Sequence, residues 1–234
     1  MLELNKVYNI DAINGFKEIP DDCIDLIITD PPYKLNKTTG SSTSSAKSES
    51  WQGNLTAGDK TVNIKNTIKF SQWIGEVYRV LKQQSHFYVF VNDKNLVDLC
   101  NEAEKVGFKL HNILVWKKNN CTPNRWYMKN CEFILFFHKG KSFPINNLGS
   151  TQLYECNNIS GKSKLHPTQK PLEYIDRLIK NSSDENDIVF DPFCGSGTTL
   201  VSAIQNRRNY IGFEIDKSHY ITTLNRIDNT IHKR

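Results

Sequence analysis

The chain has 234 residues and a formal net charge of +5 at pH 7, and this length favours one substantial core over two small domains. Its longest apolar runs, such as residues 87–91, are too short to cross a bilayer, and no charged and apolar leader begins the chain, so we expect a cytoplasmic protein without a membrane contact. The six cysteines form no CxxC pair and show no zinc spacing with the six histidines, which argues against a metal site.

Buried strands and helices are predicted to alternate along most of the chain. Residues 24–29 (IDLIIT) run almost without a polar break, as strands covered on both faces do. Further strands are expected at 86–91, 112–116, 132–137, 188–190 and 209–213. Helices are expected at 68–82, 94–106, 171–181, 198–206 and 216–231. This alternation predicts an α/β fold with a largely parallel sheet.

Two segments depart from the alternation. Residues 36–61 are crowded with Ser, Thr, Gly and Lys and carry little that can be buried, which predicts a mobile loop. A linker is the usual interpretation of such a composition, and a lid that closes on a ligand is the alternative. Residues 117–164 mix basic groups, asparagines and turn formers around one strand, which indicates an elaboration on the rim of the sheet rather than a second domain.

The positive charge is concentrated in the middle of the chain. Residues 105–170 hold 11 lysines and arginines against two acids, Glu132 and Glu155, so the remainder of the chain is net acidic. This asymmetry suggests a surface that faces a polyanion. A solvated basic face without a function explains the charge alone equally well.

A glycine-rich turn follows one of the predicted strands, in IVFDPFCGSGTTL at 188–200. The strand delivers Asp191, then Gly195 and Gly197 permit a tight turn whose N–H groups a ligand can approach, and a helix begins directly after it. The motif has neither the third glycine of GxGxxG nor GK[ST], so it matches no dinucleotide fingerprint and no P-loop. Glu214 ends the next strand, where an acid binds ribose hydroxyls in doubly wound folds. Together these features predict a nucleotide-cofactor site.

A second motif, ITDPPYKL at 28–35, ends a strand on an acid. Asp30 is expected at the same sheet edge as Asp191, while Pro31 and Pro32 remove two donors and leave an array of acceptors. Acceptors that hold the protons of an exocyclic amine favour a pyramidal nitrogen with its lone pair directed outward. Tyr33 would stack on the base. A strand that ends in a proline turn is the structural alternative, and the paired cofactor motif makes it the weaker one.

These motifs, in this order, resemble those of the β class of S-adenosylmethionine-dependent DNA amino-methyltransferases. DPPY at 30–33 precedes the cofactor motif at 191–199, and LHPTQKP at 165–171 is similar to the segment that precedes the cofactor strand in that family. The resemblance implies a doubly wound, mostly parallel, seven-stranded Rossmann-like sheet with one antiparallel strand at the edge and a circularly permuted motif order. Residues 1–234 would then form a single catalytic domain.

The resemblance also implies S-adenosylmethionine as cofactor. Its expected contacts are Asp191, Phe193, Gly195, Ser196, Gly197 and Thr198 for the methionine moiety, Glu214 for the ribose, and His166, Thr168 and Asp30 along the pocket. Asp11 and Ala12 match more loosely the segment that contacts the adenine of the cofactor, and Asp11 is equally well a turn residue.

The catalytic residues implied by the resemblance are Asp30, Pro31, Pro32 and Tyr33. An aspartate at the start of this motif usually marks adenine N6 as the target, whereas a serine is common for cytosine N4. Direct methyl transfer to adenine in duplex DNA requires that the base be flipped out of the helix. Cytosine N4, an RNA base, and a DNA-binding protein without turnover are the alternatives.

Double-stranded DNA is the expected partner, and the basic middle of the chain is its expected surface. Candidate phosphate contacts are Lys117, Lys118, Arg125, Lys129, Lys139, Lys141, Lys162 and Lys164. Asn124, Arg125 and Asn130 are candidates for reading base edges. The family implies a restriction-modification system with a separate cognate endonuclease, and it is compatible with a homodimer.

Overall fold

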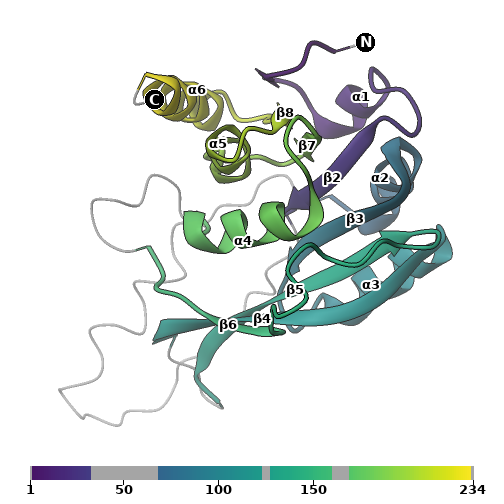
Figure 1. The fold of residues 1–234 in the computed structure, drawn as a ribbon, viewed down its shortest axis with the longest axis vertical. Helices are drawn as coiled ribbons and strands as arrows, with labels where there is room; N and C mark the ends of the chain where they lie inside the picture. The colour runs from purple at the N-terminus through teal and green to yellow at the C-terminus, as the bar shows by residue number, and fades with distance from the viewer. Residues whose placement is uncertain (1, 33–67, 123–126, 160–168, 233–234) are drawn as a thin grey trace, which may run out of the picture.

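The computed structural model describes residues 2–32, 68–122, 127–159 and 169–232. Within these ranges one sheet runs through the molecule, with helices on both of its faces (Figure 1). The strands are β1 Lys6–Tyr8, β2 Ile24–Thr29, β3 Leu81–Val91, β4 Phe108–Thr122, β5 Lys129–Lys139, β6 Leu153–Glu155, β7 Ile188–Asp191 and β8 Asn209–Phe213. The helices are α1 Ala12–Phe16, α2 Ile74–Val80, α3 Leu96–Lys105, α4 Leu172–Ser182, α5 Thr198–Gln205 and α6 Lys217–Ile231, with a 3₁₀ turn at Phe70–Gln72.

The strand order is β1-β8-β7-β2-β3-β5-β4-β6, and the sheet is mostly parallel, as predicted. Only β5 runs antiparallel to its neighbours among the described strands. It is the next described strand after β4 in the chain and pairs with β4 in the opposite direction. In the described part of the chain the sheet has eight strands rather than seven, and the antiparallel strand lies inside the sheet, because β4 and the short β6 continue it beyond β5.

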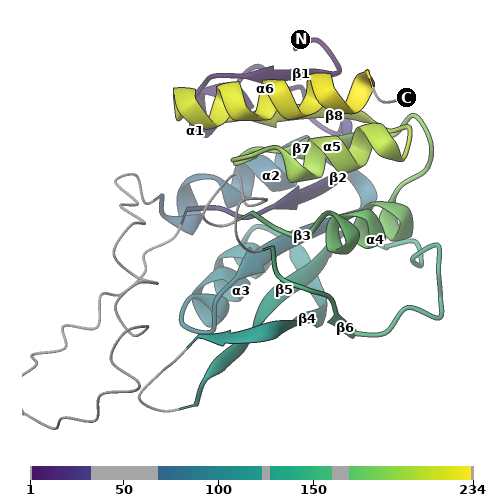
Figure 2. The same cartoon turned by 90° about the vertical axis from the view of Figure 1, so that its left-hand side faces the viewer.

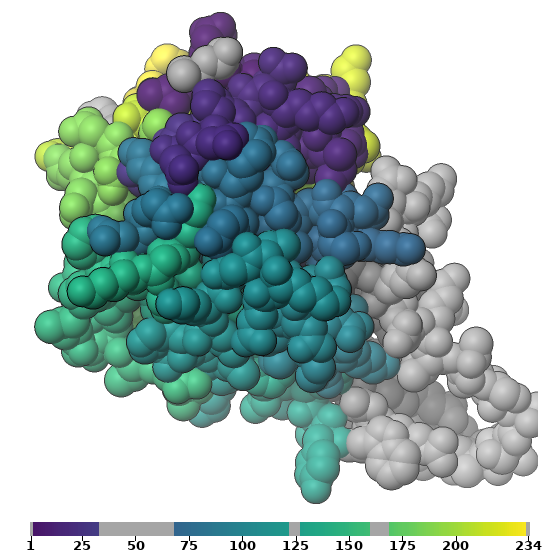
Figure 3. Space-filling model, turned by 90° about the vertical axis from the view of Figure 1, so that its right-hand side faces the viewer, coloured from purple at the N-terminus to yellow at the C-terminus, as the bar shows by residue number. Residues whose placement is uncertain are grey.

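Both faces of the central strands are buried, which explains their nearly continuous apolar sequences. Leu26 and Ile28 of β2 pack with residues of α4 and α5 on one face. Ile27, between them, packs on the other face with residues of α1, α2 and α3. Figure 2 shows α4, α5 and α6 in front of the sheet, and Figure 3 shows the opposite side, where the purple N-terminal region and the blue to teal middle of the chain form one continuous surface.

Three short elements were not predicted, namely β1, α1 and β6, because each has only three to five residues. The helix expected over 68–82 is also shorter. It ends at Val80, and β3 begins at Leu81, which pairs with Ile24 of β2. The expected mobile loop at 36–61 lies outside the described residues. None of the described helices is long and apolar enough to span a membrane.

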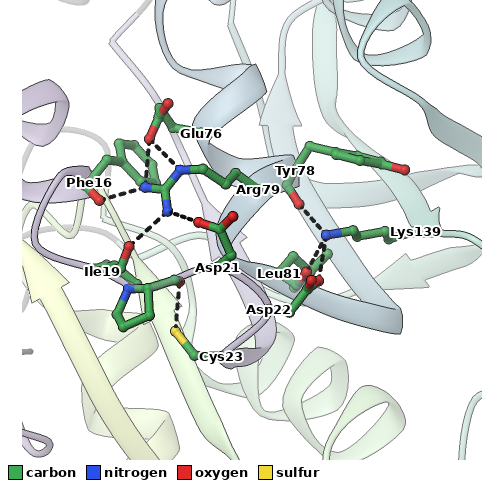
Figure 4. A network of polar contacts seen from close by, with 11 residues as sticks. Phe16, Ile19, Asp21, Asp22, Cys23, Glu76, Tyr78, Arg79, Leu81 and Lys139 are labelled. Carbon is green, nitrogen blue, oxygen red and sulfur yellow. Dashed lines mark hydrogen bonds and ion pairs between the residues drawn. The ribbon is translucent and has the colours of Figure 1, made fainter.

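Two cationic side chains, Arg79 and Lys139, connect the elements at the edge of the sheet where β2 and β3 begin (Figure 4). Arg79 of α2 donates to the carbonyl oxygens of Phe16 and Ile19 at 2.7 and 2.9 Å and pairs with Asp21 at 2.6 Å. Lys139, at the end of β5, is only 3% exposed. Its ammonium lies 2.7 Å from each of three acceptors: Asp22 and the carbonyl oxygens of Tyr78 and Leu81. These contacts fasten the turn before β2 to α2 and β5.

Candidate active site

The carboxyl ends of the central parallel strands all lie along the opposite edge of the sheet, the edge at which β2 ends. An acidic residue lies at the carboxyl end of each of three neighbouring strands. Asp30 follows β2, Asp191 ends β7 and Glu214 follows β8. Because these strands are direct neighbours in the order β8-β7-β2, the acids lie side by side. The structure therefore brings together the acids of the two sequence motifs, as the sequence predicts, at the edge where open α/β sheets bind ligands.

Asp191 is held by hydrogen bonds from its own turn and from the neighbouring strand. Its carboxylate accepts from the Thr29 hydroxyl at 2.7 Å and from the N–H of Phe193 at 3.1 Å. Burial raises the pKa of Asp191 to about 6, the nearby charge of Asp30 adds to this rise, and hydroxyl and N–H donors oppose it. The Thr29 bond joins the strand that carries Asp30 to the strand that carries Asp191.

The glycines of the turn are required by its geometry. Gly195 and Gly197 have φ values of 51° and 75°, in the left-handed region. A Cβ atom at Gly197 would also lie 2.5 Å from Cγ2 of Thr223. The turn closes through a 2.7 Å bond from the N–H of Gly197 to the carbonyl oxygen of Cys194, and α5 begins at Thr198. The predicted sequence of strand, tight turn and helix start is therefore present.

Helix α6 supports this turn from behind. The Thr223 hydroxyl donates to the carbonyl oxygen of Gly195 at 2.7 Å. The Arg226 guanidinium donates to the hydroxyls of Ser196 and Thr198, both at 3.1 Å. Sequence reasoning missed Thr223 and Arg226. Their spacing of three residues placed them on one face of a predicted helix, but nothing local indicated which loop that face contacts.

Glu214 is oriented by two backbone donors. One carboxylate oxygen accepts from the N–H of Gly195 at 2.9 Å and the other from the N–H of Asp216 at 2.8 Å. Burial raises its pKa. The Ile10 N–H donates to the Glu214 carbonyl oxygen at 3.1 Å, which brings the segment that contains Asp11 and Ala12 beside this acid.

Asp11 and Ala12 begin α1 in this place. The Asp11 side chain caps the helix by accepting from the N–H groups of Ile13 and Asn14. Ala12 is buried. Phe193 packs edge-on against the buried Trp73, with 5.4 Å between ring centroids, and so lines the base of the same turn.

Asp30 lies in a cluster of ion pairs that sequence reasoning did not predict. Oδ2 of Asp30 is 2.6 Å from Nζ of Lys170, and the same ammonium is 3.0 Å from Oε2 of Glu132. Glu132 also pairs with Lys118. Two signals could have indicated the cluster: Lys170 belongs to the LHPTQKP segment, and Glu132 is an isolated acid in a basic stretch.

The prolines after Asp30 are described, whereas Tyr33 lies outside the described residues. Pro31 is buried, Pro32 is half-buried, and the carbonyl oxygen of Pro32 accepts from the N–H of Ile68 at 3.3 Å. Other predicted site residues outside the described ranges are Asn124, Arg125, Lys162, Lys164, His166 and Thr168. Among the residues that are described, no group of His, Cys, Asp and Glu could hold a metal ion.

The described basic candidates lie at two different edges of the sheet. Lys117, Lys118 and Lys129 lie where β4 ends and β5 begins, at the edge that carries Asp30. Lys139 and Lys141 lie at the opposite edge. Lys139 is buried and its three donors are bonded within the protein (Figure 4), so we remove it from the predicted phosphate contacts.

Comparison with known proteins agrees with the geometry. A family model described as DNA methylase (N6_N4_Mtase) matches residues 24–225. The type II methyltransferase M.HpaI of Haemophilus parainfluenzae is 31% identical over 242 residues, which cover 93% of this chain and 72% of that protein. M2.MboI of Moraxella bovis is 28% identical over 225 residues, covering 89% of this chain and 82% of that protein. The crystal structure of the M1.HpyAVI-SAM complex matches with a TM-score of 0.70 and 27% identity, over 95% of this chain and 98% of that one.

Proposed function

Since this chain belongs to the DNA methylase family whose model matches residues 24–225, we propose that it methylates N6 of adenine in duplex DNA with S-adenosylmethionine as methyl donor. The family and the methyltransferase relatives confirm the predicted enzyme class. One observation carries the assignment of the site: the acid of DPPY and the acid of the cofactor motif lie on neighbouring strands joined by the bond from Thr29 to Asp191.

The described residues fit this cofactor. A sulfonium compound with an amino group and ribose hydroxyls presents positive charge and donors, and the three strand ends present the carboxylates of Asp30, Asp191 and Glu214. The glycine turn and the start of α5 offer N–H groups for its carboxylate. When bound, the cofactor supplies an electrophilic methyl group.

Asp30 acts on the substrate amine. Its carboxylate and the carbonyl oxygen of the following proline accept the two amine protons, and the nitrogen lone pair then points away from the ring. Held in this way, the lone pair would face the methyl group that a bound S-adenosylmethionine would supply. The amine then loses one proton to water. Pro31 and Pro32 stiffen the backbone, so the acceptors are held in position before the substrate arrives.

The DNA surface proposed here is the edge of β4 and β5 nearest Asp30. Lys117 and Lys129 are accessible there, paired with Glu155 at 2.7 Å and Asp93 at 2.8 Å. Such exposed pairs contribute little to stability, so phosphates can replace the carboxylates at small cost. Tyr127, two residues before β5, is 93% exposed and offers a ring for stacking.

The relatives M.HpaI and M2.MboI are named as type II methyltransferases, which supports a place for this chain in a cytoplasmic restriction-modification system with a separate endonuclease. One catalytic domain over 1–234 and a homodimer are further parts of the proposal. Light scattering of the purified protein with and without duplex DNA measures the oligomeric state.

Methyl incorporation from labelled S-adenosylmethionine tests the proposal. Duplex DNA and RNA of matched sequence are incubated with the protein, and the nucleosides are separated after digestion. N6-methyladenine in the DNA alone is the expected product. N4-methylcytosine as product would show that the target is N4 of cytosine rather than N6 of adenine. Label in the RNA would show that the substrate is RNA. The absence of any labelled product would refute the assigned reaction.

A further inference from the structure

A line of four alternating charges ends on Asp30, and its members come from four separate segments of the chain. Lys118 lies on β4, Glu132 on β5, Lys170 directly before α4, and Asp30 directly after β2. Lys118 pairs with Glu132, Glu132 lies 3.0 Å from Lys170, and Lys170 lies 2.6 Å from Asp30. The four side chains are between 10% and 28% exposed, which places them among the less accessible charges of this protein.

Lys170 is fixed in this position. Its ammonium lies 4.8 Å from the centre of the Phe90 ring, between two carboxylates. Lys170 itself is 9% exposed. A lysine so enclosed is costly to bury unless its partners are charged, and Asp30 and Glu132 supply that charge.

The Lys170 ammonium makes the two oxygens of the Asp30 carboxylate inequivalent. Oδ2 is bonded to Lys170, and no hydrogen bond from the described residues reaches Oδ1. Resting on the proposed function, we propose that Lys170 is a positioning residue for methyl transfer, which holds Oδ2 of Asp30 so that Oδ1 faces the substrate amine, and that Glu132 balances its charge.

The balancing role follows from the charge that develops in the reaction. The amine nitrogen becomes positive as the N–C bond forms, and a lone ammonium near it would oppose that change. Lys170 lies between Glu132 and Asp30, so the negative charges of these two acids offset its electric field at the amine. Lys118 forms an ion pair with Glu132 and so holds that acid in place.

The charges that face Asp30 have opposite effects on its ionisation. Burial raises the pKa of Asp30, Lys170 lowers it, Glu132 raises it, and Lys118 lowers it. Asp191, on the neighbouring strand, repels the Asp30 charge. Removal of Lys170 must therefore raise the pKa of Asp30, and removal of Glu132 must lower it. A purely structural role would not produce opposite shifts in the pH profile of the reaction.

The test compares Lys170→Met, Lys170→Arg and Glu132→Gln with the wild type in single-turnover methylation of duplex DNA from pH 5 to 9. For Lys170→Met we expect a rate lower by about 10- to 100-fold, because the acceptor is no longer oriented. The acidic limb of its pH profile moves to higher pH, whereas that of Glu132→Gln moves to lower pH. Lys170→Arg restores part of the rate, since a guanidinium also binds a carboxylate.

Cofactor affinity, measured by calorimetry, stays within about twofold of the wild type in all three variants, because the contacts of the glycine turn are unchanged. Unchanged rate and pH profile in Lys170→Met, or limbs that move in the same direction in Lys170→Met and Glu132→Gln, overturn the inference. If Lys170→Met does not fold, Lys170→Arg and Glu132→Gln decide it by the same pH profiles. A wild type without methylation refutes the proposed function instead.

Discussion

The two edges of the sheet hold lysines in different ways. At the edge where β2 begins, Lys139 is bonded to Asp22 and to the carbonyl oxygens of Tyr78 and Leu81. At the edge where β2 ends, the Lys170 ammonium forms ion pairs with two side-chain carboxylates, those of Asp30 at 2.6 Å and Glu132 at 3.0 Å. Backbone acceptors cannot move without unfolding, whereas carboxylates can exchange partners with a ligand. The nature of the acceptors therefore separates a structural lysine from one suited to a site.

Replacing Asp30 should have the largest effect on activity. Asp30→Ala is expected to lower kcat by about 10²- to 10³-fold, because a preorganised acceptor for the developing charge is lost. The thermal midpoint should not fall, since Lys170 keeps its pair with Glu132. Methyl incorporation and thermal unfolding are the measurements.

Asp25, on the same strand at the opposite edge, is the matched control. It pairs with Lys82 at 2.6 Å and accepts from the N–H of Ile188 at 2.9 Å. Asp25→Asn should reduce stability and leave the kcat of the folded protein unchanged. A large loss of kcat in Asp25→Asn, or full activity in Asp30→Ala, would contradict the contrast between the edges.

Replacing Lys139 should have the largest effect on stability. Lys139→Met removes the donor from the carbonyl oxygens of Tyr78 and Leu81, and should lower the free energy of unfolding by about 2 to 3 kcal/mol. Urea denaturation measures this loss. Lys141→Met, two residues further along at an exposed position, should change stability by less than about 0.5 kcal/mol. Equal effects in both variants would show that the buried bonds do not matter.

Gly197→Ala should weaken cofactor binding about tenfold or more. The alanine must adopt a positive φ, and its Cβ would meet Thr223 at 2.5 Å, so the turn has to move. Gly75→Ala is the control, because Gly75 lies in α2 with its closest neighbour, Val106, at 3.9 Å. That variant should bind normally and gain up to about 1 kcal/mol of helix stability. Calorimetry distinguishes the two, and equal affinities would contradict a close fit at Gly197.

The smallest expected effect is a pH dependence at Asp191. Its pKa is raised from the ordinary value of 3.8 to about 6, so between these two values the native state binds more protons than the unfolded state. This acid therefore lowers stability as pH rises through that window. A cationic cofactor needs the ionised form, so its affinity should be about tenfold weaker at pH 5 than at pH 7. Asp191→Asn should bind weakly at both values, and a pH dependence that survives in it would assign the effect elsewhere.

The sequence by itself determined the main strands and the acids at their ends. IDLIIT before Asp30 and IVF before Asp191 are apolar because both faces of the sheet are covered, and this pattern is local. The turn at Gly195 and Gly197 was also readable, since a positive φ favours glycine wherever it occurs. Parallel strands then place their carboxyl ends at one edge without further information.

Only the tertiary structure decided which charges meet. Asp30 and Lys170 are 140 positions apart, and periodicity within a strand or helix carries no signal about such a pair. Lys139 reads as another member of a basic stretch, and only the packing of β5 against α2 and the turn before β2 buries it. Local patterns follow from backbone geometry and burial, whereas the partner of a long side chain depends on how distant elements are brought together.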